Sequence, residues 1–146
     1  MKAGDTTHVD VLKVPHHGSA NNLDDDFFQR ITADHYVLSG DGEHGNPERE
    51  TLQMLLDARG RAKYTVHLTY PVAEIDVERE KEWNKERGKE QKKRLKNPKQ
   101  KVRPEWSPKE HGLVAFLAAH KDFAKKVRVV DPGQPHLIDL LDEVEG

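Results

Sequence analysis

The sequence predicts an α/β protein, because short apolar segments alternate with amphipathic helical segments over the first seventy residues. Residues 8–14 are mostly apolar and β-branched, which is typical of a strand covered on both faces. Residues 35–39 and 63–69 are expected to be the next two strands. The length of 146 residues is enough to enclose the core of one ordinary domain.

Two helices are expected between these strands. The acidic residues 24–26 favour a helix start, and the apolar residues that follow, up to Ile31, would supply its buried face. Asn46 is expected to cap the second helix, with Pro47 at its first position and Gly60 directly after its end.

The composition changes after Pro71. Residues 74–96 are rich in Glu, Lys and Arg and predict a solvent-exposed helix, which runs into the loop NPKQKVRP. The Ser-x-x-Glu spacing at 107–110 is that of a capping box, so another helix should begin there. Residues 127–130 and 136–141 are expected to close the fold as strands.

These changes divide the chain into three parts. Residues 1–73 and 107–146 are expected to form one domain, and residues 74–106 are a charged helix-and-loop insertion within it. The five expected strands are too few for a two-sheet sandwich, so the chain should lack a complementary pair of layers.

The insertion differs in charge from the rest of the chain. Residues 79–103 contain twelve Lys and Arg against four Glu, a net charge of +8, whereas the remainder carries −10 and the whole chain −2. A lysine-rich helix can neutralise the phosphates of nucleic acid without reading its sequence, or it can contact a partner protein. The alternative is a solvated helix whose glutamates pair with its lysines.

The composition excludes several classes of site. The chain has no cysteine, so disulfides and thiolate metal sites are impossible, and any metal must be bound by His, Asp, Glu or Asn. No apolar run is long enough to cross a membrane, and the N-terminus lacks the apolar stretch of a signal peptide. A cytoplasmic protein without a membrane partner is therefore expected.

A pair of histidines follows the first expected strand. In the segment DVLKVPHHGS, the strand leads His16 and His17 into a turn at Gly18. Neutral imidazole is a good ligand for Zn²⁺, although a bare His-His pair is more often ordinary surface or core material. If Pro15 keeps the chain extended, His16 is the last residue positioned by the strand and should face the metal, while His17 orients it or faces substrate.

Together with SGDG at 39–42 and GNPE at 45–48, this segment resembles the metallo-β-lactamase superfamily over residues 8 to about 60. The likeness is greatest to the branch of competence-type DNA-internalisation proteins and related phosphoesterases. It implies half of an αββα sandwich with a mixed sheet and flanking helices. It also implies a hydrolase with two zinc ions, to which His16 or His17 contributes a ligand.

The resemblance also suggests residues that face substrate. Ser19 follows the histidine pair, Asp41 and His44 lie in the glycine-rich loop, and Asn46 stands where the family has the histidine of a Gly-His-Pro step. The alternatives are a helix cap for Asn46 and a plain connecting loop for Asp41 and His44.

The sequence departs from the family in its metal ligands. The His-x-His-x-Asp-His motif is absent, and Gly4-Asp5 lies only eleven residues before His16, too close for the bridging aspartate. The chain is therefore expected to be a fragment or truncated form that is inactive alone, with an upstream half-domain or a second copy as partner. A non-catalytic module that binds nucleic acid or protein through residues 79–103 is the alternative.

Overall fold

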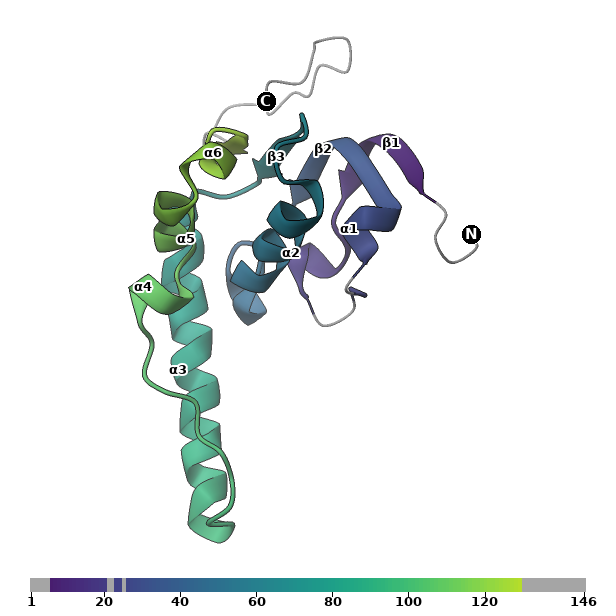
Figure 1. Cartoon of the computed structure of the whole chain (residues 1–146). Coiled ribbons are helices and arrows are strands. Elements are labelled where there is room, and N and C mark those ends of the chain that lie inside the picture. Colours follow the sequence, from purple (N-terminus) through teal and green to yellow (C-terminus); the bar gives the residue numbers. More distant parts are fainter. Residues whose placement is uncertain (1–5, 21–22, 25, 130–146) are drawn as a thin grey trace.

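The computed structural model describes residues 6–20, 23–24 and 26–129, except for the side chains of His16 and His17. This part of the chain is mixed α/β, as the sequence predicts. Figure 1 shows α1 and α2 beside the sheet and α3 projecting away from it, with α4, α5 and α6 leading back to the sheet. The elements are, in order, β1 (Thr7–Lys13), η1 (Pro15–Gly18), α1 (Phe27–Arg30), β2 (Ile31–Leu38), η2 (Glu43–Gly45), α2 (Arg49–Arg59), β3 (Thr65–Leu68), α3 (Val72–Lys96), α4 (Pro108–His111), α5 (Leu113–Ala119), α6 (Lys121–Ala124) and β4 (Val127–Val129).

The sheet has the strand order β1-β2-β3-β4. Leu12, Tyr36, Val66 and Val127 form one row across all four strands. The described pairings are all parallel, whereas a mixed sheet was predicted, and the strand predicted at 136–141 lies outside the described residues. Because all four strands run the same way, their carboxyl ends lie at one edge of the sheet.

The prediction that the first strand is covered on both faces is wrong. Among the described strands β1 is at an edge of the sheet, most of its residues are exposed, and 39% of Val11 is accessible to solvent. A run of β-branched residues predicts a strand, but it does not show whether the strand lies inside a sheet or at its edge, where its faces are less covered.

The core is built around a series of aromatic rings that links the sheet to helices from both ends of the chain. Phe28 of α1 lies 5.8 Å from Tyr36 of β2, measured between ring centroids, and Tyr36 lies 5.7 Å from Tyr64. Tyr64 is 6.4 Å from Phe123 of α6, which is 5.8 Å from Phe116 of α5. All five rings are buried, so the C-terminal helices belong to the same hydrophobic core as the sheet.

The first two helices begin and end differently from the prediction. α1 has only four residues, and Ile31, expected on its apolar face, begins β2 instead. α2 begins at Arg49 with Glu48 as its N-cap residue, so Asn46 does not cap it, because the chain stays extended through Glu48. Gly60 follows the last residue of α2, as predicted, and its N–H donates to the carbonyl of Leu56 at 2.8 Å.

The capping box at 107–110 is only partly confirmed. Ser107 is the N-cap residue of α4, but its side chain makes no capping hydrogen bond, and its backbone N–H donates to Nδ1 of His111 at 2.9 Å. α4 ends after one turn at Gly112, which is extended. A separate helix, α5, then begins, and Asp76 of α3 accepts hydrogen bonds from the backbone N–H groups of its first two residues, at 2.8 and 3.0 Å.

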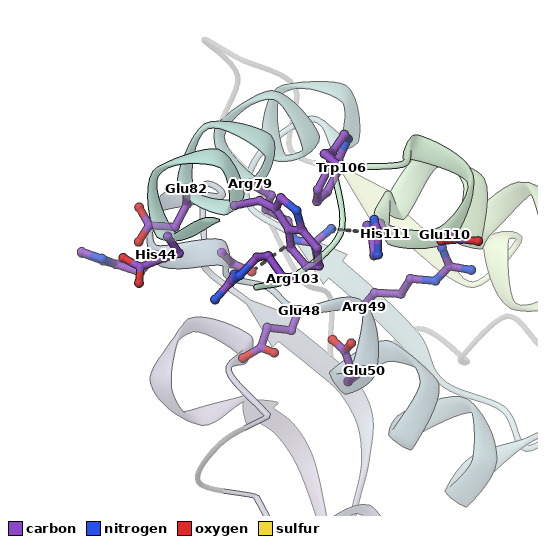
Figure 2. Close-up of a pocket in the computed structure, with 13 residues that line it drawn as sticks. His44, Glu48, Arg49, Glu50, Arg79, Glu82, Arg103, Trp106, Glu110 and His111 are labelled. Atoms are coloured by element: carbon purple, nitrogen blue, oxygen red, sulfur yellow. Dashed lines mark hydrogen bonds between the residues drawn. The ribbon is translucent and has the colours of Figure 1, made fainter. Parts of the chain in front are cut away.

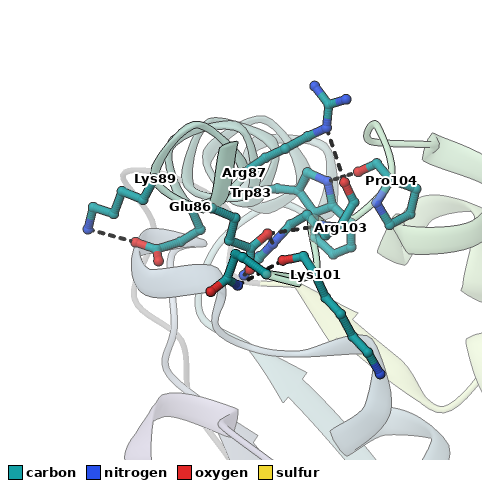
Figure 3. A network of polar contacts seen from close by, with 9 residues as sticks. Trp83, Glu86, Arg87, Lys89, Lys101, Arg103 and Pro104 are labelled. Atoms are coloured by element: carbon teal, nitrogen blue, oxygen red, sulfur yellow. Dashed lines mark hydrogen bonds and ion pairs between the residues drawn. The ribbon is translucent and has the colours of Figure 1, made fainter. Parts of the chain in front are cut away.

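The charged insertion is an ordered arm that consists of the distal part of α3 and the extended return segment 97–106 (Figure 3). Nε1 of Trp83 donates to the carbonyl of Pro104 at 2.9 Å, and Nε of Arg87 donates to the carbonyl of Arg103 at 3.1 Å. The Arg103 guanidinium binds both carboxylate oxygens of Glu90, at 2.9 and 3.0 Å. Neither α3 nor any other helix of the described residues is long and apolar enough to cross a membrane.

Candidate functional site

The loops that follow β1, β2 and β3 lie at the carboxyl edge of the sheet. The backbone N–H of Val14 donates to the carbonyl of Val37 at 2.8 Å, and that of Thr69 donates to the carbonyl of Leu38 at 3.2 Å. Open parallel sheets bind their ligands beyond this edge, because loops from several strands meet there. The His-His-Gly-Ser segment and the glycine-rich loop both belong to it.

The histidine pair lies in a single 3₁₀ turn, η1, rather than at the end of an extended strand. Pro15 begins this turn, since the φ angle that proline imposes also suits the first position of a helix. The backbone argument that favoured His16 over His17 is therefore wrong. The metal-binding prediction for His16 and His17 concerns side chains that lie outside the described part of the chain.

The turn and the two residues after it are fixed to the start of α2 by four hydrogen bonds. The carbonyl of Gly18 accepts from the backbone N–H of Glu48 at 3.0 Å and from the buried hydroxyl of Thr51 at 2.6 Å. In the other direction, Oε1 of Glu48 accepts from the Ser19 hydroxyl and from the N–H of Ala20, both at 3.2 Å. The two parts of the sequence that carry the family likeness are therefore in direct contact.

Ser19 and Asn46 occupy defined positions in this contact. Ser19 is only 7% exposed, and its hydroxyl is engaged with Glu48, so it helps to position the turn. Asn46 is half-buried, and its carbonyl accepts a hydrogen bond from the N–H of Gly42 at 2.6 Å. Asn46 thus closes the glycine-rich loop through its backbone.

Asp41 and His44, both predicted to face substrate, line different hollows. Oδ1 of Asp41 accepts the N–H of Glu43 at 2.8 Å, and Asp41 lines a hollow of about 360 Å³ together with Tyr70. His44 has a positive φ of 57° and a side chain that is 77% exposed. It lines a cavity of about 430 Å³ that Glu48 also lines.

This larger cavity, shown in Figure 2, lies between the start of α2, η2, α3 and α4. Five carboxylates and three guanidinium groups line it, from Glu48, Glu50, Glu82, Glu86, Glu110, Arg49, Arg79 and Arg103. On the same wall the His111 ring lies 4.3 Å from Trp83 and 5.5 Å from Trp106, between ring centroids. The cavity thus combines charge of both signs with an aromatic wall.

Arg79 joins three elements around the cavity. Its Nε donates to the carbonyl of Gly45 at 3.1 Å, and its Nη1 donates to the carbonyl of His111 at 2.6 Å. Only 8% of Arg79 is exposed, and burial lowers the pKa of its guanidinium, while Asp76 at 3.6 Å opposes that effect. Sequence reasoning counted Arg79 as part of a basic surface, because nothing local signals that it binds carbonyl groups 34 and 32 residues away.

A second histidine pair was missed by sequence reasoning. Nδ1 of His35 and Nε2 of His67 are 3.0 Å apart, and the two residues are 8% and 5% exposed. The pair depends on the strand register, which places His67 opposite Val37, two residues after His35 on the same face of the sheet; the positions of the strands in the sequence do not give this register. Both histidines are therefore buried in the middle of the sheet rather than in a surface loop.

The described residues do not by themselves form a zinc site. No three His, Asp or Glu side chains among them come together in a way that could bind a metal ion. A zinc site takes three or four protein ligands, so further ligands would have to come from outside this part of the chain.

No protein-family model matches the chain, and no solved structure matches it. The chain is similar to microtubule-associated protein 1A from Rattus norvegicus, Mus musculus and Homo sapiens, with 35% identity over 80 residues in each case. The match covers 53% of this chain and 3% of each of these much longer relatives.

Proposed function

We propose that the chain is one half of a metallo-β-lactamase-type hydrolase that acts on phosphoesters and is inactive alone. An upstream half-domain would carry the His-x-His-x-Asp-His motif and the bridging aspartate, and this chain would add a ligand from His16 or His17. The proposal rests on the family likeness of DVLKVPHHGS, SGDG and GNPE.

The observation that carries the proposal is the fixed geometry of the Pro15–Gly18 turn. Its backbone is bound to α2 through Glu48 and Thr51, and Gly18 packs against Pro47. Metal ligands work best on rigid backbone, because misplacement weakens coordination directly. Because buried polar groups must be hydrogen-bonded, these contacts fix the position of the turn against α2.

The position of β1 in the sheet supports the proposal that the other half of the sandwich lies outside this chain. β1 is an edge strand among the described residues, and a strand edge is a template for pairing with another chain. Val11, 39% exposed, lies on the face of the sheet opposite to Tyr36 and Leu38, which belong to the hydrophobic core. His35 and Thr65 on the same face as Val11 are each 8% exposed, so it is the β1 end of this face that is open. Under the proposal, the face with Val11 would pack against the upstream sheet to complete an αββα sandwich.

The substrate would be held by the loops at the carboxyl edge of the sheet. His44 is an exposed side chain on the wall of the cavity of about 430 Å³ and is the proposed substrate contact. Ser19 and Asn46 would act by fixing the turn and the loop, and Asp41 by shaping the start of that loop. The relatives are named for microtubule association, but the match covers only 3% of them, so no partner is transferred from them.

The test compares the isolated chain with a fusion to the upstream half of a metallo-β-lactamase-type hydrolase, using bis-(p-nitrophenyl) phosphate as substrate. The isolated chain should show no turnover, because one histidine pair cannot hold two ions. The fusion should hydrolyse the substrate only in the presence of zinc. Zinc-dependent turnover by the isolated chain that disappears in His16→Ala would refute the claim that it is incomplete, and a fusion that folds but stays inactive would refute the function.

A further inference from the structure

One face of α3 carries a row of lysines. Successive members are four, four, three and four residues apart, so they lie on the same side of the helix, and all five are exposed. The row comprises Lys81, Lys85, Lys89, Lys92 and Lys96. At a rise of 1.5 Å per residue it is about 22 Å long. The row therefore presents cations along most of the arm.

The opposite face of α3 is occupied by the return segment. Trp83, Arg87 and Glu90 make the hydrogen bonds that hold residues 103 and 104 against the helix. At about 100° per residue these three positions lie roughly half a turn from the lysine row. The return segment therefore packs on the face of α3 that is opposite the lysine row. Figure 1 shows this segment running along α3, and Figure 3 shows Lys89 pointing away from Pro104.

Most of the charge at the end of the arm is not neutralised. Glu86 pairs with Lys89 at 2.9 Å, and Glu90 pairs with Arg103 at 2.9 Å. Residues 91–101 contain six Lys and Arg and no acidic residue, and none of the six forms an ion pair with another described residue. Cations in the last turn of a helix are expected from its dipole, but that effect does not extend over the whole row.

The chemistry of this surface fits phosphate rather than protein or exposed bases. Residues 84–105 contain no aromatic residue, so the arm has no platform on which unpaired bases could stack. Leu95, 87% exposed, is the large apolar side chain at its tip, whereas protein interfaces are centred on several buried aromatic or apolar anchors. Trp83 and Trp106 lie at the base of the arm and are engaged with each other and with His111.

We propose that the arm binds the phosphate backbone of duplex nucleic acid along the lysine row, without reading the base sequence. The row runs along a straight helix (Figure 1), and Lys85, Lys92 and Lys96 present cations that no described carboxylate pairs with. Lys81 and Lys89 pair with Glu78 and Glu86 at 2.9 Å, and a densely charged polyanion can compete for these exposed lysines. The lysines of the row do not line the cavity proposed to hold the hydrolase substrate, and binding to them needs no metal.

Fluorescence anisotropy with a labelled duplex of random sequence tests this proposal, with EDTA present so that the result does not depend on the proposed zinc site. The test variant replaces four lysines of the row with glutamine, which has a similar helix propensity: Lys85→Gln, Lys89→Gln, Lys92→Gln and Lys96→Gln. The control removes the same charge elsewhere, at exposed positions outside the arm: Lys63→Gln, Lys109→Gln, Lys121→Gln and Lys125→Gln.

The wild-type chain and the control should bind the duplex with a steep salt dependence. The test variant should bind the duplex at least about tenfold more weakly. The magnitude of its slope of log K against log salt should be smaller by about 3 to 4, because each lost phosphate contact lowers that magnitude by about 0.9. Circular dichroism should show the same helix content in all three proteins. A second variant, Lys99→Gln with Lys101→Gln at the tip of the arm, should lose less affinity for the duplex than the test variant does.

Several outcomes would overturn the proposal. They are the absence of duplex binding at low salt, an equal loss in the control, and an unchanged slope in the test variant. Tighter binding to the matching single strand would contradict the duplex assignment. Preferential binding to polyglutamate over the duplex would show that the partner is an acidic polypeptide instead.

Discussion

At the scale of single residues, Gly18 is the residue of the Pro15–Gly18 turn that contacts the start of α2. Its φ is +92°, which disfavours any side chain, and a Cβ at this position would lie 2.6 Å from Cβ of Pro47. Gly45 has a similar φ of +80°, but a Cβ there would meet nothing within 4 Å. Alanine at Gly45 would therefore introduce backbone strain alone, whereas alanine at Gly18 would introduce both backbone strain and a steric clash.

Gly18→Ala should destabilise the fold by about 3 kcal/mol, because it adds overpacking to backbone strain. Gly45→Ala should cost only about 1 kcal/mol, from strain alone. Urea denaturation of both variants checks this difference. Equal losses would show that the packing of Gly18 on Pro47 is unimportant.

Tyr64 and Tyr36 are buried side by side but differ in hydrogen bonding. The hydroxyl of Tyr64 is buried and has no hydrogen-bond partner among the described residues, whereas Oη of Tyr36 accepts the N–H of Ala33 at 3.0 Å. Burial raises the pKa of Tyr64 to about 12. Because this pKa is raised in the folded state, the contribution of Tyr64 to stability is present below pH 10 and falls as the pH rises from 10 toward 12.

Tyr64→Phe should therefore be neutral or stabilising by up to about 1 kcal/mol at pH 7, and it should reduce the loss of stability between pH 10 and 12. Tyr36→Phe should destabilise by about 1 kcal/mol, because the Ala33 N–H loses its partner. Thermal unfolding across this pH range checks both variants. A destabilised Tyr64→Phe at pH 7 would show that its hydroxyl has a partner after all.

At the scale of elements, the arm depends on the ion pair between Glu90 and Arg103. Hydrogen bonds from the Arg103 side chain and backbone hold the pKa of Glu90 below its usual value of 4.5. Because that pKa is lowered, the pair stabilises the arm above pH 4.5, and this contribution is lost as the pH falls through the lowered pKa. Arg103 also lies 5.0 Å from the centroid of the Trp83 ring, so loss of the ion pair between Glu90 and Arg103 should change the fluorescence of this tryptophan.

Glu90→Gln should therefore give, at pH 7, a fluorescence spectrum close to that of the acidified wild type, and it should show no further change on acidification below pH 4.5. Glu80→Gln, an exposed position on the same helix, should behave like the wild type. A Glu90→Gln spectrum that matches the native one at pH 7 would show that other contacts hold the return segment.

Element types could be predicted from the sequence better than element ends. The strands at residues 35–39, 63–69 and 127–130 and the long charged helix follow from local pattern, and the structure confirms them within a few residues. The start of α2 was misplaced because Glu48 uses its side chain to bind Ser19 and Ala20, a contact that local capping rules cannot include. The break at Gly112 was missed for a similar reason, since Asp76 supplies the hydrogen bonds that start α5.

At the scale of the whole molecule, the α/β class could be predicted from the alternation of strands and helices. The cavity could not be predicted, because it is built from α2, α3 and α4, which lie far apart in the sequence. The same is true of Arg79, whose partners are backbone carbonyls on two other elements.

The proposed metal site is tested by the zinc content of the chain fused to an upstream half with the His-x-His-x-Asp-His motif. Elemental analysis after dialysis should find about two ions per fused chain and no stoichiometric zinc in the isolated chain. One of the single variants His16→Ala and His17→Ala should lose zinc. His8→Ala should retain it, because His8 lies at the other end of β1, bound to Thr32 and Asp34. Full zinc content in both His16→Ala and His17→Ala would contradict the proposed metal site.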